Sequence, residues 1–444
     1  MADISLVHFK SARSPSPLVA TLPVEQWPRE SLVTKMVAAF QDAMAEIVHP
    51  GDVVAVKVHL GERYSERYLR PTYVRHLVEA IRDRGGKPFV TDTLLRGSAH
   101  ATSVWTRRGV HEAMETMARN GFTTETVGAP IIFADAMNKT DGIPVKVGGR
   151  LIQTAYIAPL LADADVLISL AHFKGHDCAA FGGQMKALGV GCQSKRGKFW
   201  VHCEEKIRVV EEKCDGCGKC LEVCPTNALA RRNGHADAKV RLDPDLCTDC
   251  EQCLFACPQH ALAAKFAPLG PGLCARIGEA AAGIVNLLGK DRCGFINVAI
   301  DITPLCDCDP FTDVPFVQDI GVFASRDPVA VDRAAVDMVT ALPGLPASMA
   351  EDVGVMAPGA EKLNAIARLR WLKTPGATDQ APDWRGMLAA AEGVGLGTQG
   401  YRLVADPETI SPAVRDWLLS REGDWTSACQ GVVDAKTGSV VASR

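Results

Sequence analysis

Residues 214–225 read CDGCGKCLEVCP, and residues 247–258 read CTDCEQCLFACP. Both copies follow the spacing Cys-x2-Cys-x2-Cys-x3-Cys-Pro. Thiolates at this spacing can surround one face of an iron–sulfur cubane because each short turn points its sulfur inward. The same spacing marks the 4Fe-4S sites of bacterial ferredoxins. The two copies therefore predict two 4Fe-4S clusters in one small module.

The two cysteine runs are expected to exchange their last ligands. In two-cluster ferredoxins the fourth cysteine of each run binds the other cluster. This rule assigns one cluster to Cys214, Cys217, Cys220 and Cys257, and the other to Cys247, Cys250, Cys253 and Cys224. Closed zinc sites are the alternative for paired Cys-x2-Cys groups. The third cysteine and the trailing Cys-Pro of each run favour clusters over zinc.

The composition is that of an ordinary globular protein. The chain has 444 residues, of which 47% are hydrophobic and 23% charged, with a net charge of -4. This length allows two or three domains, and no strongly basic segment predicts a nucleic-acid partner. No apolar run reaches the roughly 18 residues of a membrane span, and the first residues lack the pattern of a secretion signal. We therefore expect a cytoplasmic protein with no membrane partner.

The number of cysteines indicates a reducing compartment. Of the 16 cysteines, those outside the two runs are expected to be free thiols rather than disulfides. Free thiols beside oxygen-sensitive clusters favour an anaerobic or microaerobic host.

Outside the cysteine runs, strand and helix patterns alternate, which favours an α/β fold built on a mostly parallel sheet. The expected helices are residues 31–48, with Ser31 as N-cap, and residues 72–84. The expected strands and strand-like apolar segments are residues 4–8, 52–58, 88–91, 129–133, 145–147 and 165–170.

The cysteine runs interrupt this α/β pattern, because strand patterns resume at residues 295–302. We therefore expect an α/β domain at residues 1–206 and 267–404, with a two-cluster ferredoxin insertion at residues 207–266. One sheet should contain strands from both parts. Residues 405–444 are expected to be a C-terminal extension.

Ligands of open α/β sheets collect beyond the carboxyl ends of the strands. Three polar loops are expected there, at residues 57–62, 91–97 and 172–176. His172, Lys174, His176 and Lys186 are the candidate catalytic residues, because imidazoles and ammonium groups suit acid–base or anion-binding chemistry. His59, Asp92, Gly182 and Gly183 are the candidate cofactor-binding residues, since paired glycines before a helix can bring amides to an anion. The alternative is that these groups only satisfy a buried loop.

Several longer strings carry a family resemblance. They are VKVHLGE (56–62), KPFVTDT (87–93), GAPIIFAD (128–135), SLAHFKGHDCAAFGGQMKALGVGCQSKRGK (169–198), FINVAIDITPLCDCDP (295–310), DIGVFASRDPVAVDRAAVD (319–337) and GVGLGTQGYRLV (393–404). With the two cysteine runs, they resemble the uncharacterised iron–sulfur centre proteins, a domain-of-unknown-function family. The resemblance implies an α/β domain with an inserted two-cluster ferredoxin and reaches to about Val404. It implies no agreed activity.

Within the resembling strings, Cys306-Asp307-Cys308 is a further candidate site. On a strand, residues i and i+2 share a face, so the two thiols would lie together while Asp307 points away. The pair could then be soft metal ligands, a redox pair or a thiolate site. Packing as small hydrophobic side chains is the alternative. Asp327-Pro328 predicts a helix start.

A shorter string, His176 to Lys186, resembles the nickel-pincer lactate racemase family. This second resemblance covers about a dozen residues. It implies an organic or organometallic cofactor near Lys186.

Clusters of this type move single electrons, so the sequence favours an iron–sulfur oxidoreductase that passes electrons to a substrate or cofactor held by the α/β domain. A redox partner protein and a small-molecule substrate are the expected partners. A non-catalytic electron carrier is one alternative, and a metal-cofactor isomerase with accessory clusters is another. An enzyme should have a cavity lined by His172, Lys174, His176 and Lys186, whereas a carrier needs none.

Overall fold

A nine-stranded sheet forms the centre of the computed structural model, which describes residues 4–13, 30–95, 106–135, 142–235, 238–267, 270–372, 381–420 and 428–443. The strand order is β17-β16-β15-β1-β14-β13-β6-β2-β3. The bounds are β1 Ser5–Ser11, β2 Val53–Val58, β3 Lys87–Thr91, β6 Val166–His172, β13 Cys293–Ala299, β14 Gly321–Ser325, β15 Tyr401–Ala405, β16 Cys429–Asp434 and β17 Val440–Ser443.

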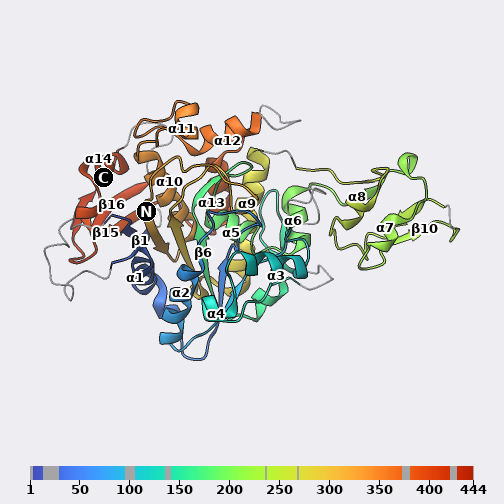
Figure 1. Cartoon of the computed structure of the whole chain (residues 1–444), viewed down its shortest axis with the longest axis horizontal. Coiled ribbons are helices and arrows are strands. Elements are labelled where there is room, and N and C mark those ends of the chain that lie inside the picture. The colour runs from blue at the N-terminus through green and yellow to red at the C-terminus, as the bar shows by residue number, and fades with distance from the viewer. Residues whose placement is uncertain are drawn as a thin grey trace.

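The sheet is mostly parallel, as the sequence predicts. The strands β3, β2, β6 and β13 pair in parallel, and so do β1, β15 and β16. The strand β14 runs antiparallel to both of its neighbours and joins these two groups. Strands that precede the cysteine runs in sequence thus share one sheet with strands that follow them (Figure 1).

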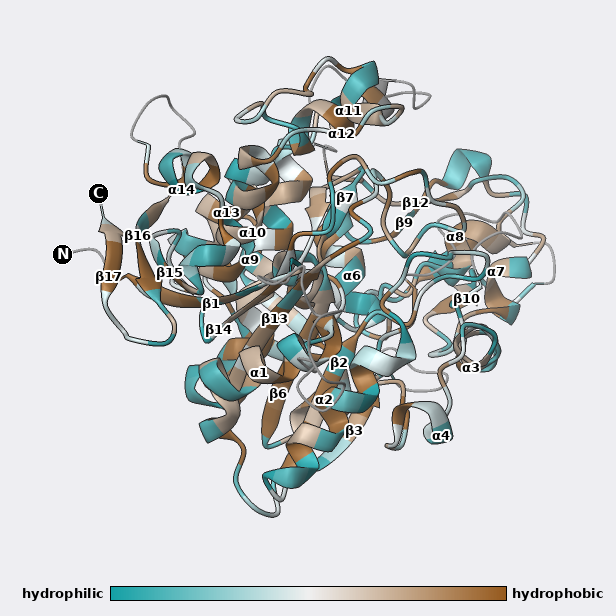
Figure 2. Cartoon of the chain, turned by 60° about the vertical axis from the view of Figure 1, so that its left-hand side comes forward, coloured by the Kyte–Doolittle hydropathy of each residue, from teal (hydrophilic) through white to brown (hydrophobic). Residues whose placement is uncertain are grey.

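Helices cover both faces of the sheet because its central strands are apolar on both sides. Val54, Val56 and Val58 of β2 pack with α1 (Leu32–Met44) and α2 (Pro71–Asp83), whereas Ala55 faces the opposite core. That second core contains α5 (Gln184–Gly189), α9 (Pro271–Leu288), α10 (Pro328–Ala341) and α13 (Trp384–Gly393). Figure 2 shows the resulting contrast, with apolar strands inside and polar outer helix surfaces.

Shorter elements surround these layers. They are α3 Val110–Arg119, α4 Thr124–Val127, α6 Lys195–His202, α11 Met349–Asp352, α12 Leu363–Leu372, α14 Pro412–Leu418, and the hairpin strands β7 Lys174–His176 and β8 Ala180–Gly182. Two predicted helix starts are confirmed. Ser31 accepts from the Thr34 amide before α1, and Asp327 accepts from the amides of Val329 and Ala330 at the start of α10. Within the described ranges, no helix has the length and apolar character to cross a bilayer.

One expected sheet segment was assigned wrongly. Val145 and Lys146 of the expected segment 145–147 belong to β4 (Ile143–Lys146), which pairs with β5 (Thr154–Ile157) in a separate antiparallel hairpin. Its burial alternates along the strand, as expected for a hairpin covered on one side only. Residues 129–133 do continue the sheet beside β3, through a parallel bridge between Val90 and Ile131 and through hydrogen bonds from the Val90 amide to the Pro130 carbonyl oxygen and from the Ile132 amide to the Val90 carbonyl oxygen. The strands β16 and β17 also place part of residues 405–444 within the main sheet.

The cysteine-rich segment has secondary structure and an apolar cluster of its own. It contains two small antiparallel pairs, β9 (Arg208–Val209) with β12 (Leu262–Ala263) and β10 (Leu229–Arg231) with β11 (Val240–Leu242). Each cysteine run has a short helix, α7 (Lys219–Glu222) or α8 (Gln252–Ala256). Ile207, Leu229, Val240 and Leu262 pack together away from the main cores. Figure 1 shows the segment extending beyond α6.

Asp332 joins α10 to α5 and β13. Its carboxylate accepts from the amides of Gln184 and Met185, at 2.7 and 2.8 Å, and from Asn297 Nδ2 at 2.7 Å. Burial raises the pKa of Asp332 to about 6. Asp332→Ala would leave buried donors without their acceptor, so we expect the free energy of unfolding to fall by on the order of 3 kcal/mol.

Anaerobic chemical denaturation tests the Asp332 prediction. The control is Asp313→Ala, whose side chain is exposed and which should change the free energy of unfolding by less than about 0.5 kcal/mol. Equal midpoints for Asp332→Ala and the unsubstituted protein would refute the structural role of this carboxylate.

Candidate functional site

The carboxyl ends of four adjacent parallel strands meet at one polar site. His59 follows β2, Asp92 follows β3, His172 ends β6, and residues 300–308 follow β13. This is the edge at which α/β sheets hold ligands. The strand order therefore places together residues that are far apart in the sequence.

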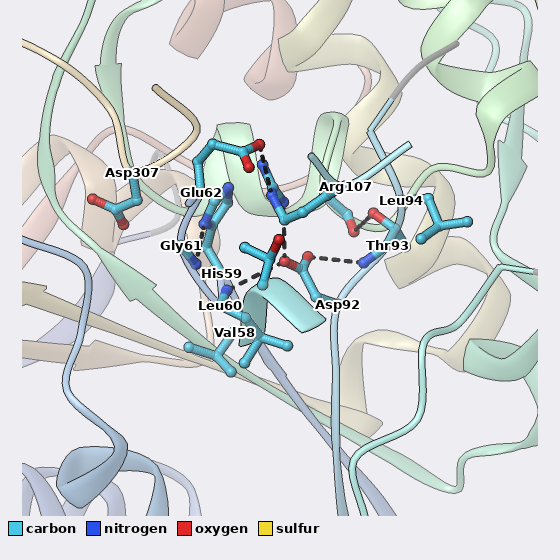
Figure 3. A network of polar contacts seen from close by, with 12 residues as sticks. Val58, His59, Leu60, Gly61, Glu62, Asp92, Thr93, Leu94, Arg107 and Asp307 are labelled. Carbon is cyan, nitrogen blue, oxygen red and sulfur yellow. Dashed lines mark hydrogen bonds and ion pairs between the residues drawn. The ribbon is translucent and has the colours of Figure 1, made fainter. Parts of the chain in front are cut away.

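A buried charge network forms the floor of the site around Asp92 (Figure 3). Its Oδ1 lies 2.9 Å from Lys57 Nζ, and its Oδ2 lies 3.5 Å from Arg107 Nη1. Arg107 Nε also contacts Glu62 Oε2 at 3.2 Å. Although burial opposes ionisation, Lys57, His59 and Arg107 hold the pKa of Asp92 far below its ordinary value. Asp92, expected to bind a cofactor, is thus bound by groups of its own chain.

Loss of the Asp92 carboxylate should be costly. Lys57 and Arg107 side chains are at most 4% exposed, and Asp92→Ala would leave their charges poorly compensated. Breaking a buried pair in this way typically costs about 3–5 kcal/mol. The control is Asp42→Ala, which breaks the exposed Lys10–Asp42 pair and should cost at most about 1 kcal/mol. Urea denaturation of both variants tests this, and equal costs would contradict the expected burial effect.

One ring nitrogen of His59, Nε2, has no hydrogen-bond partner among the residues that the structure describes. Its Nδ1 lies 3.0 Å from the Gly61 amide and accepts its hydrogen, so the neutral ring carries its proton on Nε2. Burial, reinforced by Arg107, lowers the pKa of His59 to about 4. The half-buried side chain is therefore a neutral hydrogen-bond donor at pH 7.

His172 and Lys174 are held by Asp307 rather than exposed to a ligand. His172 Nδ1 lies 2.8 Å from Asp307 Oδ1, and its Nε2 lies 2.7 Å from the Ile300 carbonyl oxygen. Both ring nitrogens thus have partners, and neither is free to shuttle a proton. Lys174 Nζ lies 3.2 Å from Asp307 Oδ2. Burial by itself would lower the pKa of Lys174, but the charge of Asp307 opposes this effect, and this pKa lies above its ordinary value.

The strand geometry expected for residues 306–308 is wrong. These residues lie in a turn, so Asp307 can face the same site as its neighbours instead of pointing away. The ligand atoms of His176, Cys306 and Cys308 all lie within 4.8 Å of one another. His176 Nε2 is 3.9 Å from Cys308 Sγ. The two thiols thus lie together and close to His176, although in a turn rather than on a strand.

Lys186 offers a charge that its own chain does not neutralise by direct contact. It is half-buried and makes no hydrogen bond or ion pair with the residues that the structure describes. It acts electrostatically on His176 and Cys308. Burial and Lys186 oppose protonation of His176, but Cys306 and Asp177 raise the pKa of His176 to about 9.

The expected anion-binding role of Gly182 and Gly183 is not supported. The amides of Gln184 and Met185, which follow them, already donate to Asp332. A Cβ at Gly183 would lie 2.5 Å from Asp332 Oδ1, and one at Gly182 would lie 3.1 Å from Lys174 Nζ. The glycines therefore permit close packing around these charged groups.

Helix α6 connects the polar site to the cysteine-rich segment. Lys198 Nζ donates to Thr93 Oγ1 at 2.6 Å and to the Leu94 carbonyl oxygen. Arg196 Nε lies 3.7 Å from Asp249 Oδ2, within the second cysteine run. Neither Lys198 nor Arg107 was among the predicted site residues. Helical spacing could have placed Lys195 and Lys198 on one face, whereas no sequence pattern distinguishes Arg107.

Cysteines from both runs meet in the cysteine-rich segment. Cys224 of the first run lines a cavity together with Cys247, Cys250 and Cys253 of the second. The pKa of Cys220 is raised to about 11, first by burial and then by the neighbouring thiols of Cys257, Cys214 and Cys217.

A second cavity lies at the other end of the strands, where they begin. Its lining includes Val53 and Lys87, at the starts of β2 and β3. Neither this cavity nor the cavity at the cysteines is lined by the four residues His172, Lys174, His176 and Lys186. The side chains of His172, Lys174 and His176 are instead at most 5% exposed. The accessible rim of the polar site consists of half-buried side chains, including His59, Lys186 and Cys308.

Comparisons with known proteins place most of these features within one family. The family model "Domain of unknown function (DUF362)" matches residues 54–337. The thylakoid-associated protein sll1697 of Synechocystis sp. is 31% identical over 167 residues, which are 36% of this chain and 45% of that relative. The chain thus spans less than half the length of this curated relative.

Two solved structures are distantly similar. The lactate racemase apoprotein from Thermoanaerobacterium thermosaccharolyticum is 12% identical, with a TM-score of 0.34, over 90% of this chain and 83% of that chain. A protein from Thermotoga maritima is 11% identical, with a TM-score of 0.31, over 67% of this chain and 56% of that chain.

Proposed function

Since the chain belongs to the DUF362 family, whose name assigns no function, we propose from its own residues that it is a two-cluster iron–sulfur oxidoreductase. The observation that carries the proposal is the cavity lined by Cys224, Cys247, Cys250 and Cys253. A cysteine of the first run there joins three cysteines of the second, which is the ligand set of a bacterial-type 4Fe-4S cluster.

The second ligand set is Cys214, Cys217, Cys220 and Cys257. Its support is the electrostatic interaction of Cys220 with the other three thiols. The separate apolar cluster of Ile207, Leu229, Val240 and Leu262 supports a ferredoxin insertion at residues 207–266. When bound, the two 4Fe-4S clusters supply single electrons at low potential.

The second cysteine run is the one beside the α/β domain. Asp249 contacts Arg196 of α6, and Lys198, two residues further along the same helix, contacts Thr93, next to Asp92. Burial lowers the pKa of Lys195, and the charges of Asp135 and Cys250 oppose this decrease. Lys195 therefore interacts electrostatically with a thiol of the second run. Cys217 of the first run is exposed. We therefore assign the first run to the side that meets a redox partner protein.

The substrate of the proposed reaction is a small anion that meets the rim of the polar site. Lys186 supplies a positive charge for it, since this ammonium makes no direct ion pair with the residues that the structure describes. The Nε2–H group of His59 can donate to an oxygen on which negative charge develops during reduction, as preorganised donors do in other enzymes. Buried Asp307, His172 and Lys174 hold the adjacent turn in place.

Viologen-linked turnover tests this function. The full chain, prepared anaerobically with its clusters, is mixed with reduced methyl viologen and a panel of small carboxylate-bearing carbonyl and alkene acceptors. We expect at least one acceptor to oxidise viologen much faster with the unsubstituted protein than with the cluster-loaded Lys186→Ala variant. Equal rates for both proteins with every acceptor would contradict a substrate site at Lys186.

A non-catalytic electron carrier is the second candidate function. It is favoured by the burial of the expected catalytic residues His172, Lys174 and His176, whose side chains are at most 5% exposed. A carrier would exchange electrons with a redox protein through its clusters and would be indifferent to Lys186. The viologen comparison therefore separates the two candidates.

A further inference from the structure

We propose that His176, Cys306 and Cys308 bind one divalent metal ion of the zinc class, separate from the iron–sulfur clusters. The three residues come from β7 and from the turn that follows β13. The site is independent of the redox function proposed above, because none of its ligands belongs to the two cysteine runs.

The spacing of the three side chains fits a single ion. Their ligand atoms lie within 4.8 Å of one another, and His176 Nε2 is 3.9 Å from Cys308 Sγ. Zinc bonds of about 2.3 Å to sulfur and 2.0–2.1 Å to nitrogen place tetrahedral ligand atoms about 3.6 Å apart. A small side-chain movement would therefore bring the three atoms onto one ion.

The surroundings of His176 favour its Nε2 as the ligand atom. Nδ1 lies 3.0 Å from Asp177 Oδ1, a carboxylate that can accept its hydrogen while the Cys178 amide donates to the same oxygen at 2.8 Å. A histidine that binds a metal through one nitrogen usually donates its other N–H to a carboxylate, a backbone carbonyl or water, which fixes the orientation of the ring. The set His176, Asp177 and Cys178 is also compact. An ion bound by that set would require Nδ1 of His176 to give up its contact with Asp177. We therefore assign the ion to His176, Cys306 and Cys308.

The donor set indicates the chemistry of the ion. Two thiolates cancel the charge of a divalent ion, and sulfur with imidazole nitrogen selects zinc or a similar borderline metal. Three protein ligands leave a fourth tetrahedral position open, as in catalytic rather than structural zinc sites. Lys186 acts electrostatically on both His176 and Cys308, so its positive charge favours an anion at the open position. We expect an anionic oxygen ligand to occupy it.

Zinc loading of the full chain tests the site. Protein with complete iron content is incubated anaerobically with Zn²⁺, freed of excess metal, and analysed for zinc and iron. We expect about one zinc per chain, and at least a tenfold loss in the Cys306→Ala/Cys308→Ala variant. The matched control is Cys293→Ala, a buried cysteine at the start of β13, which should keep its zinc.

Two further measurements make the outcome decisive. Zinc X-ray absorption of the unsubstituted protein should show two sulfur neighbours. Asp177→Asn should weaken zinc binding about 10–100-fold with unchanged iron content, because it alters the group that orients His176. The proposal is overturned if the loaded protein holds no zinc, if the double variant holds as much as the unsubstituted protein, or if Cys178→Ala loses zinc while the double variant keeps it.

Discussion

Lys186→Ala is expected to lower the rate of substrate reduction on the order of 100-fold or more while both clusters remain in place. Removal of one preorganised electrostatic contact to a developing negative charge typically has an effect of this size. Lys186 is half-buried at the start of α5, and the described residues give it no hydrogen bond or ion pair. Its loss should therefore affect a bound anion much more than the fold.

The measurement is viologen-linked turnover per cluster, recorded beside visible and paramagnetic resonance spectra. Lys146→Ala is the control, since Lys146 is an exposed residue of β4; its turnover should equal that of the unsubstituted protein. Lys186→Arg should retain part of the activity because it keeps the charge. Loss of cluster content in Lys186→Ala, with normal turnover per remaining cluster, would make Lys186 structural and favour the electron carrier.

Cys257→Ala is expected to remove the cluster held by the first run and to spare the one held by the second. Cys257 belongs to the second run in sequence, but its thiol interacts with Cys220 of the first. A 4Fe-4S cluster normally needs all four cysteine ligands. The variant should therefore lose about half of its iron.

Paramagnetic resonance of the reduced variant identifies the missing cluster. Cys224→Ala is the reciprocal variant, and it should lose the other signal because Cys224 lines the cavity of Cys247, Cys250 and Cys253. Cys293→Ala should keep both signals. If Cys257→Ala and Cys224→Ala each lose the signal of their own run, the crossover is wrong.

The sheet could be predicted where the sequence carries a strong local pattern. β2 reads VVAVKV and β6 reads VLISLAH, and both are buried almost throughout. The β4 segment IPVK is apolar at alternate positions only, which fits a half-covered hairpin as well as a sheet edge. Local sequence could not decide its partner, because the antiparallel pairing with β5 depends on the turn between them.

The location of the site could be predicted better than the roles of its residues. The strand-end rule brought His59, Asp92 and His172 to one edge without knowledge of the fold. It could not show that Ile300 and Asp307 engage both nitrogens of His172. That outcome depends on the turn after β13, whose conformation is set by tertiary contacts. The same turn explains why strand geometry failed for residues 306–308.

The most direct test of the central claim, that this chain carries two 4Fe-4S clusters, is iron and sulfide analysis of the anaerobically purified protein together with its Mössbauer spectrum. We expect about eight irons and about eight sulfides per chain, all in cubane sites. About four irons per chain, or zinc in stoichiometric amount at the two cysteine runs, would contradict it.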